Sequence, residues 1–524
     1  MGGACLLSAP LTAEADVTSV TVDYQAPFPT YSGNEYTYVE ATFTGTVPRA
    51  AGAPGNYSVG MVFIYPKNGG NKVGIVDWTN TVFFTLYGYF RTMGGEPGIC
   101  PRNEPFCDLG MADHGQRLQN ASFQFTRIIM EDFLWKDGYT YASVQWDKTV
   151  TDFFGPDMPE GRQNRLVFGK IDKGTDGYQI LADVAKYLRA PTALTGVPAP
   201  VPVTKVISAG FSQTSGVQNA FIVNDKNVSP QGPIYDGFLL QGGGYLCWPL
   251  QDEGPPFASF GACPELPDAG TAKIMTVATQ SDVQAVFAAA LSRSTPQTPN
   301  RVQYELAGVA HISTQMLDAA WVGATRQNPA DPRPFYRGAL RNLTKWVVSG
   351  TTPPPSSPID GTIQADGSLA VVVDADGNVT GGSRLPFVPS TVNGMPAGAP
   401  TGVYGGVEPA GAEPFSIILL IAGTYTRFAD AEIQRRYPTA EVFQTLVTRS
   451  ADKLLADGYI LQADRDRYAT QTAPLPIAPD PKPEPEPDSD NGCSTGSGSS
   501  SVAFGGILFA ALLLRRRQRG QRQA

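Results

Sequence analysis

The sequence predicts an α/β protein whose mostly parallel central sheet is covered by helices on both faces. Strand-like apolar runs alternate with segments whose apolar residues recur at helical spacing, which is typical of parallel sheets with crossover helices. Lys72–Trp78 is an almost continuous apolar run, as expected of a strand that is buried on both faces. Val203–Val223 has the pattern of a strand, a sharp turn with a central serine, and a helix.

The composition is that of a globular protein with many loops. The chain has 524 residues, of which 42% are hydrophobic and 10% aromatic, and its formal net charge is −9. Phosphate binding needs a basic face, so an acidic body argues against nucleic acid as a partner. We expect a signal peptide over residues 1–15, one domain over 16–472, a linker over 473–492 and a C-terminal tail over 493–524.

Antiparallel strands are expected to precede the parallel sheet. Val17–Val47 alternates polar and apolar residues, which is typical of half-buried strands. Further strands are predicted over Tyr57–Tyr65, Tyr139–Gln145, Ile234–Leu240, Lys273–Ala278 and Val302–Leu306. Helices are predicted over Phe123–Trp135, Tyr178–Arg189, Asp282–Leu291 and Arg337–Ser349, and two more within Ala429–Gln462.

The serine turn suggests nucleophilic catalysis. A β-branched strand over Val203–Ile207 leads into Gly210-Phe211-Ser212, and a helix can follow from Val217. This is the sequence of a nucleophile elbow, although Thr214 stands where the usual second glycine would be. The alternative is an ordinary strand-to-helix turn in which Ser212 caps the helix.

A serine hydroxyl needs a neighbouring base, and histidine is the usual one. The chain has two histidines, His114 and His311. His311 follows a predicted strand and comes after Ser212, so we favour it as the base. Asp282 follows the preceding predicted strand and is the expected acid, with a helix N-cap as its alternative role.

Other residues complete the predicted site. The backbone N–H of Gln213 is the expected oxyanion donor, with a second donor near Thr79 or Asn80. Glu305 and Asp318 are weaker candidates for the acid.

The cysteines and one acidic turn are the candidate metal ligands of the sequence. The pairs Cys100/Cys107 and Cys247/Cys263 suit disulfides in an exported protein better than a zinc site. Asp374–Asn378 loosely suggests a calcium loop, but its spacing fails the EF-hand template. No metal and no cofactor is expected.

A resemblance to known proteins lies in several stretches: Val73–Asn80, Gly210–Thr214, Tyr235–Leu240, Gly308–His311, Trp346–Pro354, Gly377–Gly382 and Asp457–Gln462. In these stretches the chain resembles a family of bacterial α/β-hydrolase domain proteins with no settled physiological substrate. The resemblance implies an α/β-hydrolase fold that includes the chain after Pro354. Members of that family usually carry Ser-Gln-Ser at the elbow, where this chain has Ser212-Gln213-Thr214.

The chain ends predict export. Ala13-Glu14-Ala15 is similar to a signal-peptide cleavage site, with a disordered N-terminus as the alternative. Pro474–Gly492 is rich in proline and acid, which indicates an extended spacer. Cys493, the apolar run Val502–Leu514 and the arginines after it resemble the C-terminal sorting tails of myxobacterial-type surface proteins.

The sequence therefore predicts an exported serine hydrolase, held at a membrane by its tail or processed there, at the cell surface or in the periplasm. Its substrate would be a small ester, cleaved by Ser212, His311 and Asp282. The alternative is a surface binding or structural protein that keeps the hydrolase fold without activity. The oligomeric state is not predicted.

Overall fold

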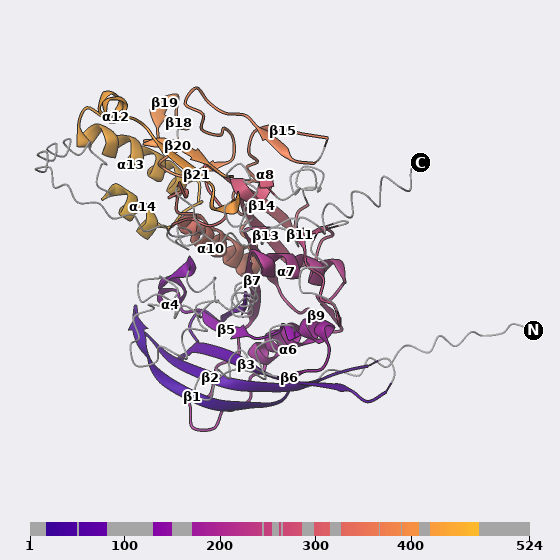
Figure 1. Cartoon of the computed structure of the whole chain (residues 1–524). Coiled ribbons are helices and arrows are strands. Elements are labelled where there is room, and N and C mark those ends of the chain that lie inside the picture. The colour runs from indigo at the N-terminus through magenta and orange to yellow at the C-terminus, as the bar shows by residue number, and fades with distance from the viewer. Residues whose placement is uncertain are drawn as a thin grey trace, which may run out of the picture. The chain divides into compact units, whose positions relative to one another are not determined.

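The computed structural model describes residues 17–49, 52–80, 129–148, 170–243, 246–253, 261–263, 266–285, 298–314, 326–365, 367–388, 390–407 and 420–470 (Figure 1). They belong to two compact units. The first unit takes residues 1–276, 294–302 and 339–353, and the second takes 277–293, 303–338 and 354–524.

The first unit opens with long antiparallel strands, as predicted. β1 (Val17–Tyr31), β2 (Asn34–Val47) and β3 (Gly55–Pro66) pair in sequence order. β3 then pairs antiparallel with β5 (Thr140–Val144). In Figure 1 these strands form the indigo layer that lies next to α6 (Gly177–Arg189).

The parallel part of the same sheet follows in the order β5-β4-β7-β10, with β4 (Val73–Trp78), β7 (Lys205–Phe211) and β10 (Gly237–Gln241). Each of these neighbouring pairs is parallel. Every residue of β4 is buried, as its apolar run predicts. Its one carboxylate, Asp77, accepts a hydrogen bond of 2.7 Å from the Tyr141 hydroxyl, so burial leaves it partnered. The predicted α/β fold class is confirmed.

Helices α6 and α7 (Gln213–Val223) share one apolar core with this sheet. Trp78 of β4 lies 5.5 Å from Phe221 of α7, ring centre to ring centre, and 6.0 Å from Tyr235. These tilted and edge-to-face contacts are the arrangements that aromatic quadrupoles favour. This packing fixes α7 against the sheet, and with it the turn between β7 and α7. Short elements of the first unit are α4 (Phe133–Lys136), β6 (Lys170–Ile171), η2 (Gly174–Asp176), β8 (Val228–Ser229), β9 (Gly232–Pro233), β11 (Leu246–Cys247) and β12 (Gly261–Ala262).

In the second unit, β14 (Arg301–Ala307) pairs parallel with β17 (Ser383–Arg384). The boundary between the units falls within β13 (Lys273–Thr279), β14 and α10 (Arg333–Ser349). The remaining strands are three hairpins, β15 (Gly361–Ile363) with β16 (Leu369–Val371), β18 (Ser390–Val392) with β19 (Met395–Ala397), and β20 (Gly402–Gly405) with β21 (Thr424–Arg427). The other helices are α8 (Gln280–Ala285), α12 (Asp430–Arg436), α13 (Ala440–Ala456) and α14 (Gln462–Ala469).

Some boundaries differ from the sequence-based prediction. The helix expected over 123–135 is broken at Glu131, whose φ is +51°, and α4 begins only at Phe133. The two helices predicted within Ala429–Gln462 are α12 and α13, and a further helix, α14, begins at Gln462. α12 ends before Pro438, because a residue that precedes proline disfavours the helical conformation, and Gly458 with φ +83° separates α13 from α14.

Asp374 serves as a turn residue. Its Oδ1 accepts hydrogen bonds from the N–H groups of Asp376 and Asn378, at 3.0 and 2.9 Å, so the carboxylate closes the turn between two short extended segments. Asp376 instead pairs with Arg436, at 2.5 Å. Within the described ranges, no group of three or more histidine, cysteine or acidic side chains could hold a metal ion.

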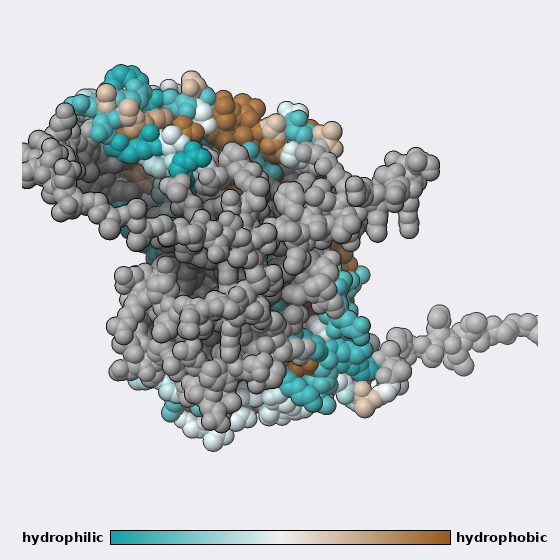
Figure 2. Space-filling view, viewed as in Figure 1, coloured by the Kyte–Doolittle hydropathy of each residue, from teal (hydrophilic) through white to brown (hydrophobic). Residues whose placement is uncertain are grey.

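The hairpins of the second unit expose apolar side chains. Val372 and Val373 are each 50% exposed, and Ile363 of β15 and Met395 of β19 are exposed as well. Figure 2 shows brown, apolar surface in the upper part of the view, where Figure 1 places these hairpins. Isolated apolar residues are normal on protein surfaces, so these positions alone assign no partner.

A buried ion pair in the second unit allows a stability prediction. Arg337 of α10 contacts Asp464 of α14 at 2.5 Å, and the two side chains are 1% and 0% exposed. Arg337→Ala is expected to lower the free energy of unfolding by about 3–5 kcal/mol, because it leaves a buried carboxylate without its main partner. Urea unfolding followed by circular dichroism measures this change.

The matched control is Arg333→Ala, one turn earlier on the same helix. Arg333 pairs with Asp331 at 2.9 Å, and both side chains reach solvent, so its loss should cost less than about 1 kcal/mol. Equal losses for the two variants would contradict the assignment. Replacing Arg337 and Asp464 together by leucine should restore most of the lost stability, because no unpaired charge remains.

Candidate active site

The turn between β7 and α7 holds Ser212 in a rare backbone conformation, with φ +58° and ψ −111°. Such a conformation costs on the order of 1–3 kcal/mol and persists only where its surroundings enforce it. Two hydrogen bonds do so here. Ser212 N–H donates to the Gln241 carbonyl at 2.8 Å, and the Ser212 carbonyl accepts from Gly216 N–H at 3.3 Å. A strained serine between a strand and a helix has the geometry of a nucleophile elbow.

Small residues make room for this turn. A Cβ at Gly210 would lie 2.8 Å from both Thr214 Oγ1 and Gln218 Oε1, so glycine lets α7 approach the strand closely. Thr214 stands where the elbow pattern has its second glycine, and its side chain forms two hydrogen bonds with the backbone of Phe211. Its Oγ1 accepts from Phe211 N–H at 2.7 Å and donates to the Phe211 carbonyl at 3.0 Å. The departure from the pattern therefore leaves the turn well supported.

The expected oxyanion residues lie at different places. Gln213 is the first residue of α7 and is buried. Asn80, which follows β4, donates from Nδ2 to the Phe211 carbonyl at 2.9 Å, so it contacts the elbow. Thr79 instead donates from Oγ1 to the Val144 carbonyl at 3.1 Å, beside Ser143. Asn80 is thus nearer to the serine turn than the Thr79 side chain is, and the donor roles stay predictions.

In the second unit, His311 Nδ1 lies 2.6 Å from Asp282 Oδ1. His311 is 5% and Asp282 2% exposed, so little water competes for this bond. Asp282 Oδ2 accepts from Thr279 N–H at 2.6 Å and from Thr279 Oγ1 at 2.8 Å. Asp282 is the third residue of α8, and Thr279 caps this helix, since its Oγ1 accepts from Asp282 N–H at 3.3 Å. The N-cap role weighed for Asp282 is therefore wrong: one of its oxygens bonds the backbone of the capping residue, as in a capping box, and the other contacts the imidazole.

The ends of β13 and β14 are tied together where this pair forms. Gln280 Oε1 accepts from Gly308 N–H at 2.8 Å, and Ser281 Oγ accepts from His311 N–H at 2.9 Å. Gly308 has φ +72°, which permits the chain to turn sharply after β14. Ser281 was not predicted, because its only signal in the sequence is its place beside Asp282.

The other predicted residues lie apart from the Ser212 turn and the His311–Asp282 contact, or outside the described ranges. Glu305 is fully buried, and its two carboxylate oxygens accept from Gln303 Nε2 at 2.6 Å and from Ile359 N–H at 2.8 Å. A disulfide joins Cys247 and Cys263, with the Cα atoms 4.8 Å apart. The residues that lie outside the described part of the chain are His114, Asp318, Cys100, Cys107, the signal segment 1–15, the linker 473–492 and the tail 493–524.

The geometry defines a class of protein, one in which an α/β sheet presents a strained serine after a strand and a buried histidine–aspartate pair. The family described as "Alpha/beta hydrolase domain" matches residues 118–470. The chain belongs to this alpha/beta hydrolase domain family. No curated protein matches the chain.

Among solved structures, the chain is similar to a CE15 glucuronoyl esterase from Teredinibacter turnerae T7901. The identity is 14% and the TM-score 0.25, and the match covers 50% of this chain and 61% of that one. No helix within the described ranges is long and apolar enough to cross a membrane.

Proposed function

We propose that this protein is an exported serine hydrolase that cleaves small carboxylic esters, with Ser212 as nucleophile, His311 as base and Asp282 as the acid that orients it. The observation that carries the proposal is the strained Ser212 turn between β7 and α7. A serine that only capped a helix would not need a positive φ, because caps form from extended backbone. Support also comes from family membership and from the His311–Asp282 bond of 2.6 Å.

The proposed chemistry proceeds in two stages. Ser212 Oγ bonds to the ester carbonyl carbon while its proton passes to His311 Nε2, and the carbonyl oxygen becomes an oxyanion. Collapse of this intermediate breaks the ester C–O bond, and the proton from His311 goes to the leaving alcohol. Water then attacks the acyl-serine in the same way, which releases the acid and restores Ser212. Asp282 Oδ1 contacts Nδ1, so Nε2 is the nitrogen that takes the proton.

Gln213 N–H is the proposed oxyanion donor, since it follows the nucleophile at the start of α7. Asn80 steadies the same turn through the Phe211 carbonyl and marks the β4 end from which a second donor would come. Ser212 belongs to the first unit and the His311–Asp282 pair to the second, so the proposal requires the hydroxyl to reach Nε2 during catalysis.

A fluorophosphonate probe tests this function against the alternative of an inactive surface protein. Such probes phosphonylate serines that an adjacent base activates, so the full-length protein should be labelled on the peptide that carries Ser212. Asp282→Asn should lower kcat by roughly 10⁴-fold, because an amide cannot stabilise the imidazolium and favours the wrong tautomer. A labelled wild type combined with an unaffected Asp282→Asn variant would remove Asp282 from the mechanism.

Export is the second part of the proposal. The Cys247–Cys263 disulfide supports it, because such bonds persist in oxidising compartments. We expect the full-length protein at the cell surface and a truncation ending at Gly492 in the medium or periplasm, because the tail acts as anchor or sorting signal. Cell fractionation measures both. Recovery of the two forms in the cytosol would contradict export.

A further inference from the structure

The end of β10 and the loop after it contact α7 and the serine turn at several points. The Gln241 carbonyl accepts from Ser212 N–H and from Ser215 Oγ, both at 2.8 Å. A Cβ at Gly243, where φ is +96°, would lie 3.4 Å from the Ser212 carbonyl oxygen. The chain at Gly243 therefore lies directly against the Ser212 backbone. Every one of these contacts lies within the first unit.

Leu246 and Trp248 form hydrogen bonds with α7 itself. Asn219 donates from Nδ2 to the Leu246 carbonyl at 2.9 Å, and Trp248 N–H donates to the Gly216 carbonyl at 3.0 Å. A Cβ at Gly216 would lie 3.2 Å from the Trp248 Cβ, so the indole residue packs tightly on the first turns of the helix. These two bonds are made by Leu246 and Trp248, the residues on either side of Cys247.

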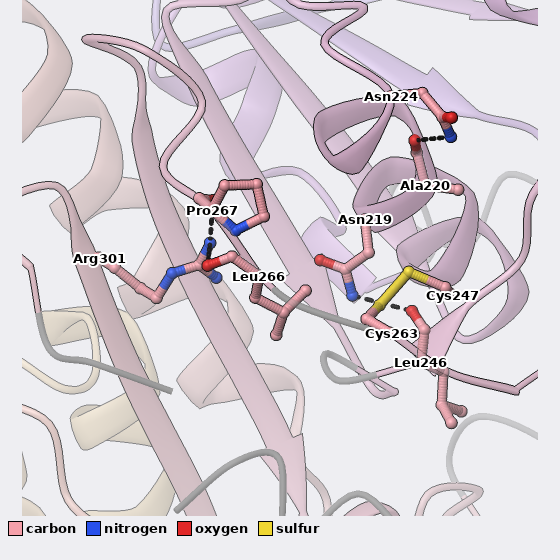
Figure 3. Close-up of a disulfide and its surroundings, with 9 residues drawn as sticks. All are labelled: Asn219, Ala220, Asn224, Leu246, Cys247, Cys263, Leu266, Pro267 and Arg301. Carbon is pink, nitrogen blue, oxygen red and sulfur yellow. Dashed lines mark hydrogen bonds between the residues drawn. A yellow bond between two sulfur atoms is a disulfide. The ribbon is translucent and has the colours of Figure 1, made fainter. Parts of the chain in front are cut away.

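The far end of this segment is anchored as well. Leu250 N–H donates to the Tyr178 hydroxyl at 2.9 Å, and Asp252 accepts from Thr175 Oγ1 at 2.6 Å. The disulfide fixes the segment from the other direction, through Cys263. Arg301 then holds the chain beyond Cys263, with its guanidinium donating to the Pro267 carbonyl at 2.8 Å (Figure 3). The segment 246–252 is thus restrained along its length.

We propose that this segment acts as a clamp on the elbow, with Asn219 and the Cys247–Cys263 disulfide as positioning groups for Ser212 and the Gln213 N–H. The inference rests on the proposed function. The clamp holds α7 by Gly216 and Asn219, and the serine turn depends on the Gly216 N–H bond to the Ser212 carbonyl. If the clamp loosens, α7 shifts relative to β7, and the hydroxyl and the oxyanion donor lose their alignment. A displacement of about 1 Å can cost roughly 100-fold in rate.

The helix supplies a matched control for Asn219. Asn224 also donates from Nδ2 to a backbone carbonyl, that of Ala220 at 2.7 Å, but at the far end of α7. Figure 3 shows Asn219 directed at Leu246 beside the disulfide, whereas Asn224, the residue after α7, bonds back to Ala220 of that helix. Asn219→Ala and Asn224→Ala each remove one amide bond from the same helix, and only the first loosens the clamp.

The experiment measures three quantities on the full-length protein: the fluorophosphonate labelling rate at Ser212, kcat and KM for a p-nitrophenyl ester, and hydrogen exchange at residues 213–216. Asn219→Ala and the double variant Cys247→Ser/Cys263→Ser should lower the labelling rate and kcat roughly 10- to 100-fold with little change in KM, and speed exchange at 213–216. Asn224→Ala should keep wild-type values. If the double variant does not fold, reduction of the folded wild type with a phosphine replaces it.

The outcomes separate the clamp from the function. A labelled wild type whose Asn219→Ala variant is labelled at the same rate, with unchanged exchange at 213–216, overturns the clamp and leaves the hydrolase. Faster exchange at 213–216 in a protein whose wild type is never labelled at Ser212 supports the clamp and overturns the hydrolase. A loss of thermal stability without any change in labelling or exchange would assign Asn219 a purely structural role and also overturn the clamp.

Discussion

Ser212→Ala is expected to lower kcat for p-nitrophenyl ester hydrolysis by roughly 10⁶-fold, the size of loss seen when a triad serine protease loses its nucleophile. Alanine keeps the Cβ but has no hydroxyl to form the acyl-enzyme. The turn already accommodates a non-glycine residue at φ +58°, so alanine adds no backbone strain. Kinetics together with circular dichroism measure both effects, and a folded variant with near-normal turnover would remove Ser212 from the mechanism.

Ser215→Ala is the control for this prediction. Ser215 lies on the first turn of α7 and donates from Oγ to the carbonyls of Gly210 and Gln241, at 2.9 and 2.8 Å. Its loss leaves a buried bond unmade and should cost about 1–3 kcal/mol of stability. Turnover should stay several orders of magnitude above that of Ser212→Ala, because the Ser212 hydroxyl and Gln213 N–H are still present. The pair therefore distinguishes lost chemistry from lost stability.

His311→Ala is expected to be about as damaging as Ser212→Ala, and the double variant no worse than either single one. The members of a catalytic unit fail together, because without the base the serine is no longer activated. His311 Nδ1 lies 2.6 Å from Asp282 Oδ1, so this contact holds the imidazole in one orientation. Alanine has no nitrogen that could take the serine proton. Steady-state kinetics of the three variants measure the non-additivity.

His114→Ala is the control for the base and should be nearly silent. His114 lies upstream of Ser212 in the chain, whereas the expected order places the histidine last. If His114→Ala were the inactive variant and His311→Ala retained turnover, the order of the triad would be wrong. An additive loss in the double variant would mean that Ser212 and His311 act independently.

Much of the fold could be predicted from the sequence. The apolar run of β4 and the amphipathic pattern of α6 depend on neighbours in the chain, so periodicity alone identified them. The break at Glu131 could not be predicted in this way, since nothing in the local pattern requires a positive φ there. Two helices were predicted within Ala429–Gln462 and two lie there, separated at Pro438, whereas the further helix α14 was not predicted.

The candidate site was also partly readable from the sequence. Ser212 stood out because a strand, a small-residue turn and a helix are consecutive in the chain. The role of Thr214 did not, because its two bonds to Phe211 depend on the turn geometry rather than on residue type. The contribution of Gln241 was invisible for another reason, since its carbonyl reaches Ser212 only through the pairing of β10 with β7.

The amino-acid sequence by itself determined the α/β class, the serine turn and the choice of His311, because periodicity, turn chemistry and chain order are local or counted properties. Only the tertiary structure decided that Asp282 contacts His311 while Glu305 binds Gln303 and Ile359. It also decided that Asn219 grips the loop beside the disulfide. Bonds between residues far apart in the chain depend on which strands pair and how helices pack on them, and no short window of sequence contains that information.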